Sequence, residues 1–285
     1  AGELPELRKT VQIAGSHTAA EGHDWAAMME NSLPVPAPVF DTATDVAAIL
    51  YTSGTTGKPK GAMLTHRNLA ANTASVFRAM QLQPGKDTFL VVLPLFHSFA
   101  ATAGMLTPLL YGAAIAPLPR FEPAGVADTI AAVRATIFLG VPSMYTVLLR
   151  LPDDAADKLA SLRFCVSGGA SMPVDVLRQF EEKFGKKIYE GDGPTECSPV
   201  TCVNPIDGER RIGSVGLPVP GVEMSIRDEQ MNELPDNEIG EICCRGDSMM
   251  KGYWNQPEET AQAFHGDWFK TGDLGYRDDD GYFYI

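Results

Sequence analysis

Apolar residues in the middle of the chain fall into short runs that alternate with segments of helical periodicity. Runs of strand length occupy residues 89–93, 113–116, 136–139, 163–167 and 188–190. Between them, apolar residues recur at helical spacing in 126–133, 144–149 and 174–184. An earlier helix follows Thr65, which can cap it, and its apolar face comprises Leu69, Thr73, Val76, Phe77 and Met80. This alternation predicts an α/β fold with a mostly parallel sheet flanked by helices on both faces.

The pattern changes after Asn204-Pro205. Short strand candidates separated by turns occur at 223–227, 241–244 and 268–269, with one helix near 257–264, and Asp280-Gly281 predicts the turn of a last hairpin. We therefore expect a partial leading segment and linker (1–45), an α/β subdomain (46–205) and a small β-rich subdomain (206–285). Because the hairpin breaks off at Ile285 and Ala1 is not an initiator, we interpret the sequence as a piece of a longer protein.

Residues 88–119 contain no Asp, Glu, Lys or Arg. A stretch of this length could cross a membrane as one helix. Prolines and glycines interrupt it at positions 94, 104, 108, 112 and 117, which favours a buried strand, helix and strand instead. We expect no transmembrane segment, and peripheral contact with a membrane stays open.

The composition is that of a globular protein large enough to be an enzyme. The chain has 285 residues, of which 45% are hydrophobic and 21% charged, and this excludes general disorder. A formal net charge of −13 argues against nucleic acid as a partner. The five cysteines form neither a disulfide framework nor a zinc pattern, so we expect reduced thiols and a cytoplasmic location. The oligomeric state is not readable.

Residues 51–61 predict a phosphate-binding loop after an apolar run. Glycine amides can converge on an anion, hydroxyls can donate to phosphate oxygens, and lysines add positive charge. Pro59 excludes a Walker A loop, because a Ser or Thr must follow the lysine there to bind magnesium. The candidate nucleotide-binding residues are Thr52, Ser53, Gly54, Thr55, Thr56, Gly57, Lys58 and Lys60.

The ten residues 52–61 resemble the signature [ST]-S-G-[ST]-T-G-x-P-K-G of the adenylate-forming enzymes, which include acyl-CoA synthetases, luciferases and peptide-synthetase adenylation domains. The resemblance extends over roughly residues 45–285. It implies an acyl-CoA synthetase-like fold whose second part is a distorted, barrel-like β-rich subdomain. It also implies ATP, Mg²⁺ and coenzyme A as ligands and catalytic roles for Thr52 and Lys60.

A second segment, residues 189–196, resembles the family's glycine-rich T-E motif. By that resemblance Thr195 holds the α-phosphate and Glu196 binds Mg²⁺, both as catalytic residues, and Gly191 and Gly193 approach the nucleotide. Taken alone, a Thr-Glu pair after a strand is usually a helix cap. Asp192 stands where many relatives have an aromatic side chain that stacks on adenine. It could accept a hydrogen bond from the adenine amino group or turn to solvent, and the sequence leaves both open.

A third segment, residues 268–273, resembles the family's W-x-x-T-G-D motif, and the resemblance implies that Asp273 accepts the ribose hydroxyls. Gly168, Gly169 and Ala170 resemble another family segment and would lie against the nucleotide. The acyl-binding residues implied in the same way are His97, Val141, Gly168 and Gly193. A histidine at a strand end can equally be purely structural.

The implied reaction joins a carboxylic acid to the α-phosphate of ATP and then forms a thioester with coenzyme A. Residues 93–100 contain no acid to pair with a substrate ammonium, which favours a fatty or aromatic acid. Residues 195–205 look most like those of medium- or long-chain fatty acyl-CoA synthetases. The alternatives are an aromatic-acid CoA ligase, an amino-acid adenylation domain, or a nucleotide-binding remnant. The family's hinge and its lid lysine are expected beyond Ile285, so we expect the piece alone to be inactive in the full reaction.

Overall fold

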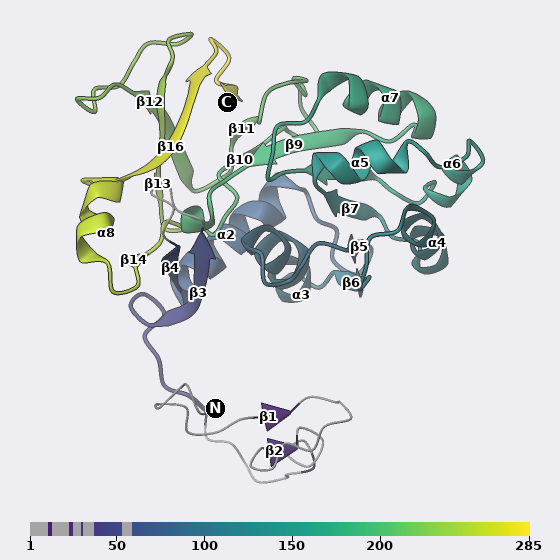
Figure 1. Ribbon diagram of the computed structural model, residues 1–285, viewed down its shortest axis with the longest axis horizontal. Coiled ribbons are helices and arrows are strands. Elements are labelled where there is room, and N and C mark those ends of the chain that lie inside the picture. The colour runs from purple at the N-terminus through teal and green to yellow at the C-terminus, as the bar shows by residue number, and fades with distance from the viewer. Residues whose placement is uncertain (1–10, 13–22, 25–29, 31–36, 53–58) are drawn as a thin grey trace. The chain divides into compact units, whose positions relative to one another are not determined.

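The computed structural model describes residues 11–12, 23–24, 30, 37–52 and 59–285. The chain separates into two compact units, Ala1–Phe40 and Asp41–Ile285. In the first unit, β1 (Val11–Gln12) pairs in parallel with β2 (His23–Asp24). All further described elements belong to the second unit (Figure 1).

A seven-stranded sheet with the order β11-β10-β9-β8-β7-β5-β6 forms the larger part of the second unit. The strands from β9 to β6 run parallel, and β10 and β11 continue the sheet antiparallel at one edge. The predicted, mostly parallel sheet is therefore confirmed. The strand bounds are β5 (Thr88–Val91), β6 (Ala114–Pro117), β7 (Ile137–Gly140), β8 (Phe164–Ser167), β9 (Ile188–Asp192), β10 (Cys202–Val203) and β11 (Leu217–Pro218).

Helices cover both faces of this sheet, as the sequence pattern predicts. Successive strand residues point to opposite faces, so Leu139 packs in the same cluster as Val76 of α2, whereas Phe138 packs in the cluster of Tyr145 of α5. The helix bounds are α2 (His66–Ala79), η1 (Ala100–Leu106), α3 (Thr107–Leu110), α4 (Pro123–Val133), α5 (Pro142–Leu148), α6 (Ala155–Lys158) and α7 (Val174–Phe184).

The uncharged stretch 88–119 folds as β5, η1, α3 and β6, which confirms the expected strand, helix and strand. Within the part of the chain that the structure describes, no helix is long and apolar enough to cross a membrane.

Helix α2 begins with the predicted cap. The Thr65 hydroxyl accepts the Asn68 N–H at 3.2 Å, and the Asn68 side chain accepts the Thr65 N–H at 2.9 Å. This reciprocal pair satisfies two backbone donors at the helix start.

Two antiparallel sheets account for most of the later chain. One has the order β12-β13-β16-β15, with β17 also paired to β16. The other has the order β14-β4-β3, so β14 from the later chain completes a sheet with strands that flank the phosphate loop. The bounds are β3 (Val46–Thr52), β4 (Lys60–Thr65), β12 (Val222–Arg227), β13 (Gly240–Gly246), β14 (Gly252–Tyr253), α8 (Pro257–Ala263), β15 (Phe264–His265), β16 (Trp268–Arg277) and β17 (Phe283–Tyr284).

The two predicted subdomains share strands across their expected boundary at residue 205. β11 joins the large sheet, and β14 pairs with β4. The division into 46–205 and 206–285 stays a prediction, and these pairings tie the two parts together.

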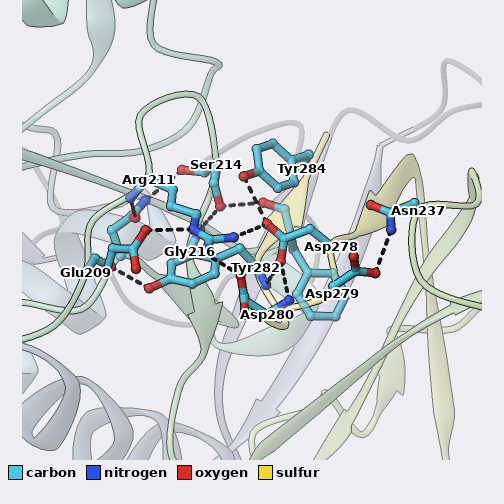
Figure 2. Close-up of polar contacts among 12 residues, drawn as sticks. Glu209, Arg211, Ser214, Gly216, Asn237, Asp278, Asp279, Asp280, Tyr282 and Tyr284 are labelled. Atoms are coloured by element: carbon cyan, nitrogen blue, oxygen red, sulfur yellow. Dashed lines mark hydrogen bonds and ion pairs between the residues drawn. The ribbon is translucent and has the colours of Figure 1, made fainter.

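The last hairpin is held to the loop before β11 by a charged network (Figure 2). Arg211 pairs with Asp278 and Asp280, each at 2.6 Å, and its guanidinium lies 4.4 Å from the centre of the Tyr282 ring. The Tyr282 carbonyl accepts the Asp278 N–H at 2.9 Å, which closes the predicted turn. This network places Ile285 beside the cavity described next.

Candidate active site

A cavity of 430 Å³ lies where the parallel strands β8 and β9 end. Ligands of open α/β sheets bind at this carboxyl edge, because the loops that leave the strands meet there. Nine of the candidate site residues line the cavity: His97, Gly168, Gly169, Ala170, Gly191, Asp192, Gly193, Thr195 and Asp273. Segments that are far apart in the sequence therefore meet in one place. Their individual roles remain predictions.

Glu196 lies just beyond the lining of this cavity, in the short helix η2 (Thr195–Cys197) that follows β9. Its Oε1 accepts hydrogen bonds from Thr52 Oγ1 at 3.4 Å and from Tyr253 Oη at 2.9 Å. The residue is buried, and its backbone carbonyl also accepts the Met250 N–H at 2.7 Å. The structure thus joins the T-E motif to Thr52, the first residue of the signature segment 52–61.

Lys60, the second lysine of that loop, is engaged by α8. Its Nζ lies 2.6 Å from Glu259 Oε2 and 5.1 Å from the centre of the Tyr253 ring. Lys60 is not among the residues that line the cavity. Residues Ser53, Gly54, Thr55, Thr56, Gly57 and Lys58, which carry the rest of the loop prediction, lie outside the described residues.

Val141, the remaining acyl-binding candidate, lies near the cavity rather than on its wall. A Cβ added to Gly169 would lie 3.7 Å from Val141 Cγ1, so the two residues are neighbours.

Position 193 requires glycine for a steric reason, because an added Cβ would lie 1.7 Å from the Pro199 carbonyl oxygen. That approach leaves no room for any side chain at position 193.

Carboxyl groups give the cavity wall its electrostatic character. The pKa of Asp192 is raised to about 6. Burial is the larger cause, and the charge of the neighbouring Asp273 carboxylate adds to it. Partial desolvation of its carboxyl group, followed by the charge of Glu196, also raises the pKa of Asp273, although the residue as a whole is exposed. Burial raises the pKa of Glu190, although the Gly213 N–H, which donates to its Oε2 at 3.2 Å, opposes the shift. Among the described residues that line the cavity there is no Lys or Arg.

Two polar contacts at the site were not anticipated from the sequence. Ser98 Oγ and Thr195 Oγ1 share a hydrogen bond at 3.0 Å, which links the 93–100 segment to the T-E motif. The second is the Tyr253 hydroxyl on Glu196. Residues Gly252-Tyr253-Trp254 resemble a segment of the adenylate-forming enzymes, which is a sequence signal for Tyr253. Nothing local in the sequence pairs Ser98 with Thr195.

The donor set around Glu196 fits Mg²⁺. This ion takes oxygen ligands and is usually held by one or two carboxylates together with substrate phosphates and water. No group of three or more His, Cys, Asp or Glu side chains in the described part of the chain is placed to hold a metal ion. Glu196 supplies one carboxylate, and both hydrogen bonds that it accepts from described side chains end on Oε1. No described side chain hydrogen-bonds its Oε2.

Comparison with known proteins identifies the class. A family profile described as AMP-binding enzyme matches residues 3–254, and the chain belongs to this family. It is 40% identical over 267 residues to a long-chain-fatty-acid–CoA ligase of Bacillus subtilis (strain 168), covering 92% of this chain and 48% of the relative. It is also 40% identical over 265 residues to a sulfoacetate–CoA ligase of Cupriavidus necator, covering 90% and 51%.

The fold agrees with that assignment. The crystal structure of ATP-bound MatB from Rhodopseudomonas palustris superposes with a TM-score of 0.82 at 38% identity, covering 87% of this chain and 49% of that one. The predicted acyl-CoA synthetase-like fold is confirmed. The chain spans about half the length of the curated relatives that it matches.

Proposed function

We propose that the intact protein activates a carboxylic acid with ATP and transfers the acyl group to coenzyme A. One observation carries this proposal: nine candidate residues from four separate segments line the same cavity. Beside it, Thr52 contacts Glu196. The named activities of the relatives, fatty-acid–CoA ligase and sulfoacetate–CoA ligase, support the same reaction class.

In the first step the substrate carboxylate attacks the α-phosphate of ATP, forming an acyl-adenylate and releasing pyrophosphate. In the second step the coenzyme A thiol adds to the acyl carbonyl and loses its proton, and AMP leaves with the electrons of the acyl–phosphate bond. No covalent enzyme nucleophile is needed. Catalysis then depends on positioning and on stabilising charge at the phosphates.

Residues of this chain would divide these tasks. Thr195, hydrogen-bonded to Ser98, would hold the α-phosphate, and Asp273 would accept the ribose hydroxyls. Thr52 would donate to phosphate when it is not bonded to Glu196. Lys60 would act as a phosphate ligand only after exchanging its partner Glu259. Bound Mg²⁺, held by Glu196, would neutralise phosphate charge.

For the substrate we favour a medium- or long-chain fatty acid. Apolar side chains make up much of the cavity wall, among them Met80, Phe99 and Val203. A second anionic group on the acid, as in sulfoacetate, calls for a cationic partner, and the described wall has no Lys or Arg. An amino acid is the second candidate, because Glu190 and Asp192 reach the cavity from β9 although residues 93–100 carry no acid.

The test is ATP–pyrophosphate exchange and thioester formation by the intact protein with fatty acids, sulfoacetate, benzoate and amino acids. We expect exchange that requires both a fatty acid and Mg²⁺, followed by acyl-CoA formation. Absence of exchange with every acid would contradict the proposed reaction. Exchange with amino acids alone would replace the fatty acid in the proposal.

A further inference from the structure

Tyr253 connects two regions of the site that are distant in sequence. It lies on β14, where it pairs with Ala62 of β4, and only 7% of the residue is exposed. Its hydroxyl donates to Glu196 Oε1 at 2.9 Å, which is shorter than the 3.4 Å bond that the same oxygen accepts from the described Thr52 hydroxyl. A hydrogen bond from a neutral donor to a buried carboxylate is strong and directional.

The backbone around Tyr253 is fixed on both sides. The Tyr253 N–H donates to Thr260 Oγ1 at 2.8 Å, and the Trp254 N–H donates to the Gly61 carbonyl at 2.8 Å. Gly252 packs so closely on α8 that an added Cβ would lie 2.7 Å from Thr260 Cγ2. The tyrosine is therefore anchored to both α8 and β4.

The ring of Tyr253 is also held by charge. Lys60 Nζ lies 5.1 Å from the ring centre, within the range of a cation–π contact, and Glu259 of α8 binds the same ammonium at 2.6 Å. The side chain of Lys60 is 12% exposed and that of Glu259 is 36% exposed, so this ion pair is shielded from solvent on the lysine side. Ring, ammonium and carboxylate form one packed unit behind Glu196.

We infer that Tyr253 is a positioning residue for Glu196: its hydroxyl holds Oε1, the Lys60–Glu259 pair holds the ring, and Oε2 is thereby presented to the cation of a bound nucleotide. This inference rests on the proposed function, because it assigns Glu196 to an ATP-borne Mg²⁺. A purely structural tyrosine would stabilise the fold without affecting how Mg²⁺ and ATP assist each other in binding. That coupling is the property to measure.

The experiment is calorimetric titration of the intact protein with ATP, with and without Mg²⁺. The variants are Tyr253→Phe and, as matched control, Tyr282→Phe, which also loses a buried tyrosine hydroxyl bonded to an acceptor, the Glu209 carbonyl. We expect Tyr253→Phe to lose about tenfold of the Mg²⁺-dependent gain in ATP affinity, the value of one hydrogen bond to a charged group. Its affinity for ATP without Mg²⁺ should stay near that of the wild type, and Tyr282→Phe should retain the full gain.

A full Mg²⁺-dependent gain in Tyr253→Phe would overturn the inference, whatever happens to its thermal stability. If this variant fails to fold, Glu259→Gln decides the matter, since it keeps the Tyr253 hydroxyl and removes the carboxylate that holds the Lys60 ammonium against the ring. We expect it to lose about threefold of the Mg²⁺-dependent gain, the value of a partly exposed ion pair, and an unchanged gain would again overturn the inference. Wild-type protein that binds no ATP would contradict the proposed function itself, which separates the two failures.

Discussion

Three carboxylates lie near one another at the site, in different surroundings. Glu196 is buried and accepts two hydroxyl hydrogen bonds, Asp192 is half-buried on β9, and Asp273 is exposed on β16. The sequence motifs name all three residues. Their environments, which set how each can act, come from three different elements of the fold.

Replacing Glu196 and replacing Asp273 in the intact protein should impair different properties, the exchange rate and nucleotide binding respectively. Glu196→Gln should slow ATP–pyrophosphate exchange and raise the Mg²⁺ concentration that it requires, because the cation loses its carboxylate. Asp273→Ala should mainly weaken ATP and AMP binding. Each effect should be roughly 1.5–3 kcal/mol, the value of a hydrogen bond to a charged group. Exchange kinetics and nucleotide titrations measure the two effects.

Glu229→Gln is a suitable control for both variants, because Glu229 is an exposed acid outside the cavity lining. It should leave exchange and binding unchanged. Normal exchange and normal nucleotide binding in both site variants would show that the motif assignment is mistaken.

Asp192 should make stability depend on pH in a defined direction. Its pKa rises from 3.8 to about 6 in the folded state, so the native protein retains this proton between those values while the unfolded chain releases it. Stability from this group is therefore present below about pH 4 and falls as the pH rises toward 6. Above that window the buried carboxylate is a net cost.

Asp192→Asn should accordingly raise the free energy of unfolding at pH 7 by about 1–2 kcal/mol, allowing for partial exposure, and leave it nearly unchanged at pH 4. Urea unfolding at the two pH values tests this. An equal shift at both values would point to packing rather than to charge.

At the scale of elements, the junction between β9 and η2 is built on backbone contact. The segment after β9 runs so close to Pro199 that Gly193 touches its carbonyl group, and β9 is paired to β10 directly beside it. The loop that carries Thr195 and Glu196 is thus closed on itself between β9 and β10.

Gly193→Ala should therefore destabilise the protein by more than about 3 kcal/mol or prevent folding, since the added methyl group would overlap a backbone oxygen. Gly125→Ala provides the contrast: Gly125 lies inside α4, and an added Cβ would meet its nearest neighbour at an ordinary 3.8 Å. That change should stabilise by about 0.5–1 kcal/mol through helix propensity. Thermal and urea unfolding of the two variants measure the difference, and comparable stabilities would contradict the packing argument.

At the scale of the whole molecule, the rate should depend on the length of the fatty-acid chain that the cavity binds. Each methylene group that becomes buried should lower the activation free energy that corresponds to kcat/KM by about 0.8 kcal/mol, until the cavity is full. Rates of the intact enzyme with acetate, hexanoate, decanoate and palmitate measure this slope. A flat series would contradict the proposed fatty-acid substrate, and a preference for benzoate would favour an aromatic acid instead.

Much of the fold could be read from local pattern, because strands and helices differ in the period with which they bury apolar residues. Leu139 and Phe138 alternate between the two faces of β7, and Val126 and Ile130 of α4 share one face at helical spacing. The Thr65 cap and the Asp280-Gly281 turn are equally local. The strand Lys60–Thr65 was not anticipated, since it owes its conformation to pairing with β3 and β14.

The sequence by itself determined the family and the residues that carry the candidate chemistry, because the order and spacing of residues in a short motif can be recognised without knowing the fold. Only the tertiary structure decided which of those residues meet. Lys60 pairs with Glu259 and Tyr253 with Glu196, contacts that span almost 200 and nearly 60 positions respectively. Such pairs form when strands and helices pack, and their distances depend on the register and crossing of whole elements, which no local pattern encodes.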